Sequence, residues 1–311
     1  MTTVTDTGAG APPAEPAPSG DTLKGFFFAL TAYLLWGFLP LFMKLVAHLP
    51  TLEVLAHRVI WSVPIALLLL VWLGRTSDIS RALRSPRTMM QAAVAAAFIS
   101  CNWGIYVWAI SVDRVLETAL GYYINPLLTV LVGALLLGER MSRAQMVAIG
   151  FAVAAVAVLT WDAGGLPWVS LALAGTWAAY AFFKRTLPVG PAQGFLLEVL
   201  ILLVPALAVA AWFQATGRGH FFEPGGYEAV LFVGCGVVTA VPLIIYATGA
   251  KLLTLSTIGI MQHIAPTLIF LMAVFVFHEP FSQVKLFAFA LIWIALAMYT
   301  WSFLSRRGAA R

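Results

Sequence analysis

The chain has 311 residues, of which 61% are hydrophobic and 10% are charged, and its formal net charge is +5. Soluble domains carry about 25% charged residues, so this chain has too little charge to coat a globular surface of its size. The basic residues lie between long apolar runs, which favours a topological role for them over binding to nucleic acid. Composition therefore excludes an ordinary soluble domain and indicates an all-α membrane protein.

Apolar runs of about 20 residues, the length that crosses a bilayer, begin after a tail at residues 1–21. This tail is rich in Ala, Pro, Gly and Thr, which predicts disorder, and residues 304–311 form a basic C-terminal tail. Between the tails we expect ten transmembrane helices. They are 25–47, 54–73, 88–110, 117–137, 143–161, 167–185, 194–213, 227–249, 255–277 and 283–303.

The distribution of Lys and Arg predicts the orientation of these helices. If the N-terminus is cytoplasmic, thirteen of the 18 basic residues fall in cytoplasmic segments. Both termini are therefore expected in the cytoplasm. Cys101 and Cys235 lie inside apolar runs and indicate neither a disulfide framework nor a metal site.

The second half of the chain repeats the first at an offset of 140 residues, the separation of Pro126 and Pro266. Because each half holds five spans, an odd number, the second half must enter the membrane from the opposite side. We therefore expect two inverted five-helix repeats, 24–161 and 166–303, an arrangement that supports alternating access. The other matched pairs are Tyr106 with Tyr246, Glu139 with Glu279, Ser142 with Ser282, Thr160-Trp161 with Thr300-Trp301 and, after a slip of one residue, Trp36 with Trp177.

The fourth helix of each half contains a proline and ends in Gly138-Glu139 or His278-Glu279. Further motifs are Ala32-Tyr33-Leu34-Leu35-Trp36-Gly37, Glu53 to Ser62 with His57-Arg58 and Trp61, Asn102-Trp103, and Gly121-Tyr122-Tyr123-Ile124-Asn125-Pro126. The fourth-helix features resemble the EamA drug/metabolite transporter superfamily, and the further motifs resemble its RarD branch. The resemblance covers about 24–303 and implies an inner-membrane exporter or permease whose substrate is undefined.

Ionisable residues within spans are costly and are functional candidates. Arg58 lies about four residues inside the second span, close to Glu53 and His57, and Lys44 lies near the outer end of the first span. Both cations could instead extend to the headgroups. Arg58 is expected to face a cavity, and together the two favour a solute with an anionic group.

Polar residues from both halves are expected to meet near the middle of the membrane, where inverted-repeat transporters bind substrate. Tyr122, Tyr123 and Asn125 come from the fourth span, and Gln262 and His263 occupy the matching part of the ninth. The helix-kinking residues Pro126 and Pro266 weaken hydrogen bonds just upstream. The alternative is a kinked helix whose polar groups bond only to neighbouring backbone.

Asn102, Tyr106 and Tyr246 either line the same cavity or form interhelical hydrogen bonds. Glu139 and Glu279 are interpreted as structural, and Ser142 to Gln145 as a capping box that begins the fifth span.

The function expected from these features is secondary-active transport of a small organic metabolite or drug by alternating access. The chain shows no enzyme motif, and no cofactor or metal is expected. A membrane channel and a scaffold that does not transport remain the alternatives. The expected partners are a small-molecule substrate and the lipid bilayer, whereas proton coupling and a homodimer stay open.

Overall fold

The computed structural model describes residues 21–308 except 73, 75, 77–78 and 138–140. The expected disordered tail, apart from Asp21, the end of the basic C-terminal tail and Glu139 lie outside the described residues. Every regular element of the described part is helical. The elements are α1 (Leu23–Leu45), α2 (Thr51–Trp72), α3 (Ile79–Leu83), α4 (Pro86–Ser111), α5 (Val115–Leu137), α6 (Arg143–Ala163), α7 (Trp168–Thr186), α8 (Pro191–Ala215), α9 (Tyr227–Ala250), α10 (Leu255–Met261), α11 (Ile264–Leu271), the π-helical η1 (Met272–Val276) and α12 (Gln283–Gly308).

Within the described residues, nine helical segments are long and apolar enough to cross a membrane. The expected span at 167–185 corresponds to α7, which has 19 residues and is not one of these nine. It carries polar residues such as Thr176 and Lys184, yet it lies inside the bundle and packs against α4 and α5. The protein is therefore an all-α membrane protein with nine segments of clear spanning character and α7 as a tenth candidate.

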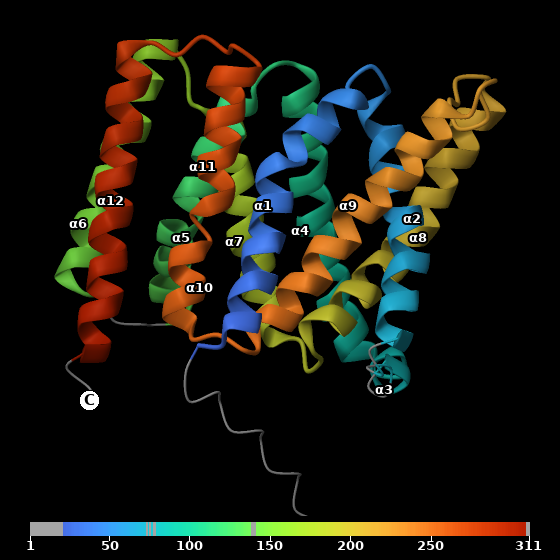
Figure 1. Cartoon of the computed structure of the whole chain (residues 1–311), viewed down its shortest axis with the longest axis horizontal. Coiled ribbons are helices and arrows are strands. Elements are labelled where there is room, and N and C mark those ends of the chain that lie inside the picture. Colours follow the sequence, from blue (N-terminus) through green and yellow to red (C-terminus); the bar gives the residue numbers. More distant parts are fainter. Residues whose placement is uncertain (1–20, 73, 75, 77–78, 138–140, 309–311) are drawn as a thin grey trace, which may run out of the picture.

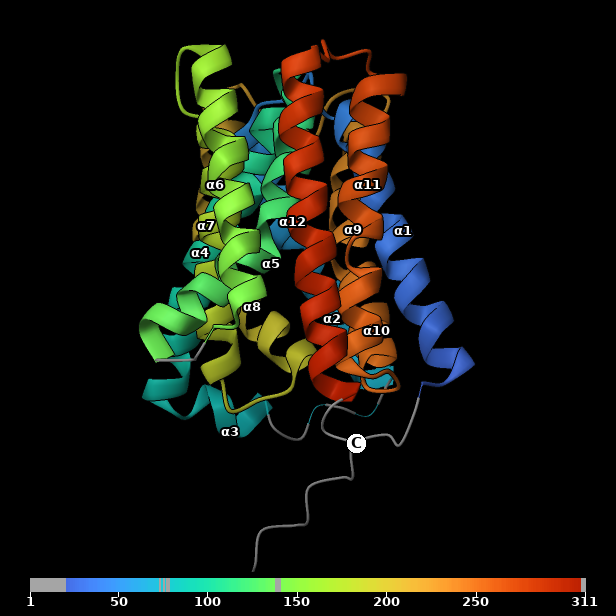
Figure 2. The same cartoon turned by 90° about the vertical axis from the view of Figure 1, so that its left-hand side faces the viewer.

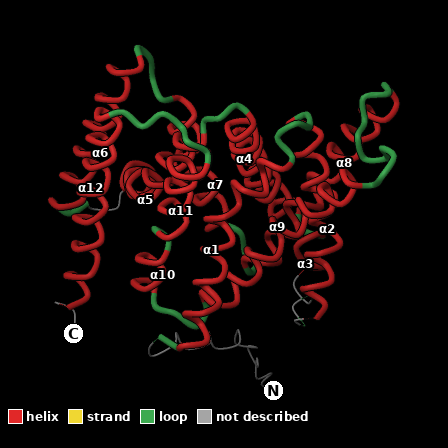
Figure 3. Tube along the Cα trace, turned by 45° about the horizontal axis from the view of Figure 1, so that its top comes forward, coloured by secondary structure: helices red, strands yellow, loops and turns green. Residues whose placement is uncertain are grey.

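The long helices run up and down and pack into one bundle (Figures 1 and 2). The start of α1 and the end of α12 lie at the same face of the molecule (Figure 1), called here the termini face. The loops after α1, α4 and α8 lie at the opposite face. Pairing α6 with α12 closes one edge of the bundle, and α2, α8 and α9 pack together at the other, as the tilted trace also shows (Figure 3).

Helices suit this sequence because a membrane leaves backbone N–H and C=O groups no water to bond, and a helix satisfies them internally. Small residues then let some helices approach closely. A Cβ added to Gly236 of α9 would overlap the backbone of Trp61 in α2, and one added to Gly249 would lie 3.0 Å from the carbonyl oxygen of Gly25 in α1. These glycines hold α9 between α1 and α2.

The two proline-containing segments behave differently. The ninth span is interrupted between Met261 and Ile264, so that Gln262 and His263 lie between α10 and α11, just before Pro266. In contrast, α5 continues through Pro126 as one helix. Only the second of the two matched prolines therefore accompanies an interruption in the described helices.

Polar side chains mark the helix ends as expected. Ser142 and Gln145 form a capping box that begins α6. The Glu279 carboxylate accepts hydrogen bonds from the backbone N–H groups of Val115 (2.5 Å) and Leu116 (2.8 Å) at the start of α5. Burial raises the pKa of the Glu279 carboxyl, whereas the two N–H donors act in the opposite direction. Glu279 thus has the structural role expected for it.

Candidate functional site

Arg58 is buried in α2, with 4% of its surface exposed. Its Nε donates a 2.7 Å hydrogen bond to the hydroxyl of Thr239 in α9. Its Cζ lies 4.7 Å from the ring centre of Trp103 in α4, a cation–π contact. The Nη1 group is buried and has no hydrogen-bond partner, and among the described residues no carboxylate lies within ion-pair distance of this guanidinium.

Three of the other predicted site residues gather beside Arg58. Tyr106 and Tyr122 lie near the guanidinium, and their ring centres are 5.8 Å apart. The Tyr122 hydroxyl donates to Asn102 Oδ1 at 3.4 Å, and Asn102 Nδ2 donates to the Thr176 hydroxyl of α7 at 2.9 Å. The Tyr106 hydroxyl is buried and unpartnered. Helices α2, α4, α5, α7 and α9 therefore build one polar and aromatic cluster, called here the Arg58 cluster.

Tyr123 bonds to a residue of the ninth span that the sequence did not suggest. The Tyr123 hydroxyl lies 2.8 Å from the hydroxyl of Thr267 in α11. Thr267 in turn donates to the backbone carbonyl of His263 at 2.7 Å. His263 Nε2 and Asn125 Oδ1 are both buried without a partner. The fourth and ninth spans are thus joined through Tyr123 and Thr267. The meeting of the Tyr123 and His263 side chains and their contact with a substrate stay predictions.

Tyr246 belongs to a separate aromatic group. Its ring centre lies 5.6 Å from that of Tyr33 and 5.4 Å from that of Trp36, both in α1. These rings pack α9 against α1. Gln262 lies at the end of α10 and is partly exposed.

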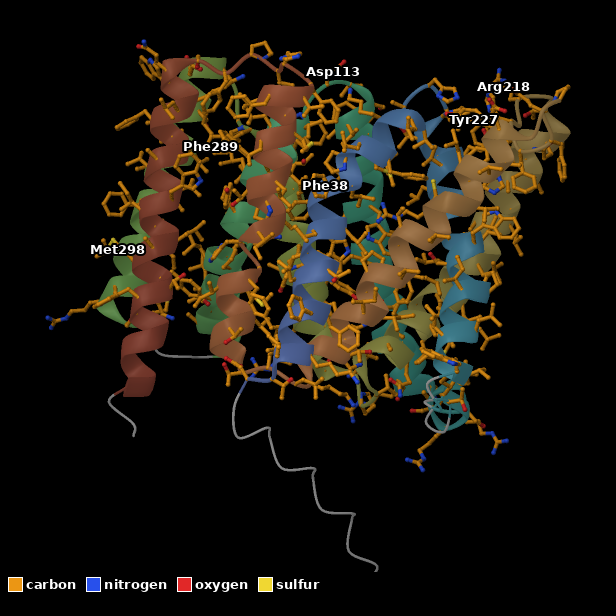
Figure 4. The ribbon with its side chains drawn as sticks, viewed as in Figure 1. Phe38, Asp113, Arg218, Tyr227, Phe289 and Met298 are labelled. Atoms are coloured by element: carbon orange, nitrogen blue, oxygen red, sulfur yellow. The ribbon has the colours of Figure 1, made fainter. Side chains whose placement is uncertain are left out.

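Lys44 lies apart from Arg58. Its ammonium forms an ion pair with Asp113, in the loop after α4, and lies 5.4 Å from the ring centre of Phe277. Asp113 sits at the face opposite the termini (Figure 4). The two cations that sequence reasoning grouped together therefore occupy different environments, with Lys44 at the surface and Arg58 inside the bundle.

Glu53 and His57 share α2 with Arg58, but they contact the loop between α8 and α9. The fully buried Glu53 carboxylate accepts from the backbone N–H of His220 at 2.8 Å and lies 2.6 Å from His220 Nδ1. The His57 ring packs against Phe221 of this loop, with ring centres 4.8 Å apart, and against Phe232 of α9, at 4.2 Å. These contacts hold the loop against α2 near the face opposite the termini.

One buried carboxylate was missed by the sequence analysis. Glu198 of α8 is fully buried and pairs with Lys184 Nζ at 2.6 Å, and the Tyr180 hydroxyl donates to it at 3.2 Å. It lies inside the expected span 194–213, so the rule that flagged Arg58 as an ionisable residue within a span would also have identified Glu198.

Two hollows in the described structure lie away from the Arg58 cluster. A cavity of about 280 Å³ opens at the face opposite the termini and is lined by Asp113, Arg114, Glu117, Glu279 and Lys285 among others. A shallower groove runs along α6 past Thr160 and Trp161. Neither is lined by Tyr123 or His263, and the shared cavity expected between those two residues stays a prediction.

Comparison with known proteins identifies the family. Residues 23–161 match the EamA-like transporter family. The chain is 40% identical to the protein RarD of Streptomyces exfoliatus over 289 residues, which are 92% of each chain. This chain belongs to the EamA-like transporter family. It is also 36% identical to the protein RarD of Escherichia coli (strain K12) over 278 residues, which are 89% of this chain and 95% of that one.

The fold has a counterpart among solved structures. A crystal structure with 23% sequence identity aligns with a TM-score of 0.57 and covers 91% of this chain and 98% of its own. That likeness concerns the fold alone. As an EamA-family member with RarD homologues, the protein is a multi-pass membrane transporter and not an enzyme.

Proposed function

We propose that this EamA-family protein is a secondary-active transporter of a small organic anion. The observation that carries the proposal is Arg58, a buried cation with a free donor and no carboxylate near it in the described structure. Leaving a buried charge unpaired costs several kcal/mol, and the cost is especially high within a membrane. An anionic substrate group would supply the missing charge and accept the free hydrogen bonds.

The neighbours of Arg58 define how such an anion is held. Arg58 Nη1 and the Tyr106 hydroxyl are two buried donors in one cluster, both without partners. The Nε bond to Thr239 and the contact with Trp103 orient the guanidinium, so its remaining donors point in a defined direction. A carboxylate or phosphate matches this donor set because a guanidinium binds both in a forked geometry.

The packing of the helices supports an inverted repeat of 24–161 and 166–303. In such a repeat α1 corresponds to α7, α2 to α8, α4 to α9, α5 to α11 and α6 to α12. Corresponding helices make corresponding contacts. Helix α4 packs on α7 as α9 packs on α1, and α5 packs on α7 as α11 packs on α1. Two related halves provide two packings of similar energy, which is the basis of alternating access across the inner membrane.

The test is a flux measurement in proteoliposomes with a panel of small monocarboxylates, dicarboxylates, aromatic carboxylates and organic phosphates. Neutral amides of the same compounds serve as matched controls. Saturable, ATP-independent uptake of an anion but not of its amide is expected. No flux of any anion by folded protein would overturn the proposal. Flux that does not saturate would indicate a channel.

Arg58→Met should lower kcat/KM for the transported anion by more than about tenfold, because it removes the charge but keeps a long side chain. Arg58→Lys should also be impaired, since an ammonium does not reproduce the forked donors. Arg114→Met is the matched control. Arg114 pairs with Glu117 at 2.5 Å at the face opposite the termini, outside the Arg58 cluster. Equal activity of Arg58→Met and the wild-type protein would contradict the assignment.

A further inference from the structure

A second buried charge lies in the half of the bundle nearer the termini face. Glu198 is the eighth residue of α8, as Arg58 is the eighth residue of α2. Because α2 and α8 start at opposite faces, each group lies about 10 Å inside its helix from its own side, at a rise of 1.5 Å per residue. At the repeat offset of 140, position 58 falls on position 198. Related positions of the two halves therefore carry opposite charges.

The cation that pairs with Glu198 is more exposed than the carboxylate itself. Its carboxylate is fully buried, whereas 19% of the Lys184 side chain is exposed. Gly194, one turn before Glu198, gives the lysine its path: a Cβ added there would lie 3.0 Å from Lys184 Nζ. The ammonium thus reaches inward across a glycine from the end of α7, with a route back towards the aqueous side.

Few other titratable groups bear on this carboxylate. Within the described residues, only Lys184 and Tyr180, both from α7, bond to Glu198. The helices packed against α8 are α2, α3, α4 and α9. Their other charged or titratable groups are Arg81 on α3, Arg84 just after it, Arg87, Cys101 and Tyr106 on α4, Glu53, His57 and Arg58 on α2, and Tyr227, Glu228, Cys235 and Tyr246 on α9.

Side-chain contacts connect Glu198 to the Arg58 cluster by two routes. Through α8, Phe195 packs edge-on against Trp103 at 6.3 Å, and Trp103 lies over the Arg58 guanidinium. Through α7, Tyr180 contacts Trp177 at 5.7 Å, and Trp177 contacts Tyr122 at 6.2 Å. A movement of α7 relative to α8 would therefore shift the rings that pack against the Arg58 cluster.

We propose that Glu198 binds the proton that drives transport, and that Lys184 is its alternating counter-ion. This inference rests on the proposed function and names its coupling ion. The proton adds to a carboxylate oxygen and leaves Glu198 neutral, which releases the Lys184 ammonium to water and loosens α7 from α8 at the termini face. Loss of the proton restores the ion pair and closes that face.

The charges favour movement of the proton with the anion. Moving one elementary charge across the membrane costs about 2.3 kcal/mol per 100 mV. One proton on Glu198 and one negative charge at Arg58 cancel, so a monovalent anion and a proton cross together without net charge. The expected reaction is therefore proton–anion symport.

The test uses proteoliposomes and the fastest anion of the flux panel, in two assays. An imposed pH gradient, acid outside, should drive accumulation of the anion by the wild-type protein. Glu198→Gln should lose this accumulation by more than about tenfold, while exchange of labelled for unlabelled anion without a gradient falls much less. Glu117→Gln is the matched control, since Glu117 also pairs with a cation but near the opposite face.

Accumulation by Glu198→Gln that follows the pH gradient as the wild-type protein does would overturn the inference. So would wild-type transport that ignores the gradient, and in that case the proposed function stands. A complete absence of flux by the wild-type protein overturns the proposed function instead.

A labelling measurement tests protonation of Glu198 even if Glu198→Gln does not fold or no flux is found. Dicyclohexylcarbodiimide reacts with protonated carboxyl groups in apolar surroundings, and mass spectrometry of the wild-type protein locates the adduct. Labelling of Glu198 that rises on acidification supports the proton site, whatever the outcome of the flux panel. A Glu198 that stays unlabelled at every pH overturns it.

Discussion

At the scale of single residues, two histidines have buried ring nitrogens without a hydrogen-bond partner in the described structure. Both ring nitrogens of His57 are of this kind, and its ring packs against Phe221 and Phe232. His263 lies in the interruption between α10 and α11, and its Nε2 is buried without a partner in the described structure. An unsatisfied buried polar group calls for a reason, and a substrate hydrogen bond at this depth would provide one.

His263→Ala should strongly reduce anion flux at unchanged expression, because it removes a potential substrate contact and little packing. His263→Gln should keep most of the flux, since an amide can replace the hydrogen bond. The exposed His48 provides the control substitution His48→Gln. If Glu198 carries the coupling proton, His263→Gln also keeps the response to a pH gradient. Loss of that response would assign the proton to His263 instead.

At the scale of structural elements, the loop between α8 and α9 is held by the first turns of α2. Gly217, Gly225 and Gly226 adopt positive φ, which allows the loop to turn tightly. Its described side-chain contacts with α2 are the Glu53–His220 pair and the packing of Phe221 against His57 and Trp61. Tyr227 and Arg218 mark the position of this loop at the face opposite the termini (Figure 4).

His220→Ala should release this loop, because it removes the side-chain bond to a fully buried carboxylate and leaves Glu53 with one donor. Trypsin should then cleave detergent-solubilised protein faster after the exposed Arg218. Glu223→Ala is the control, as its carboxylate lies 3.9 Å from His220 Nε2 and is partly exposed. Equal cleavage rates in the two variants would show that the Glu53–His220 pair does not hold the loop.

At the scale of the whole molecule, the start of α1 and the end of α12 share one face (Figure 1). The excess of Lys and Arg predicts that this face is cytoplasmic. A reporter fused after Asp78, next to α3, should therefore read as cytoplasmic, and one fused after Gly219 as periplasmic. Reports from the same side for both fusions would be incompatible with the order of the helices. A reversed pair would refute the orientation alone.

The sequence alone determined nine of the ten expected helical spans and the family. Spanning helices arise from local apolar runs, because each helix satisfies its own backbone hydrogen bonds in the membrane. The expected boundaries accordingly lie within a few residues of the observed ones, and the capping box at Ser142 formed as expected. The RarD-like motifs around Arg58 were likewise readable in the chain and agree with the relatives found.

Only the tertiary structure decided which polar residues meet. Lys44 and Arg58 looked alike in sequence, but Lys44 pairs with Asp113 at the surface, while Arg58 bonds to Thr239, 181 positions away. Glu198 was readable as a charge within a span, yet its pairing with Lys184 appears only once α7 and α8 are placed together. These side chains find their partners on other helices or loops, so the pairs depend on how the whole bundle packs.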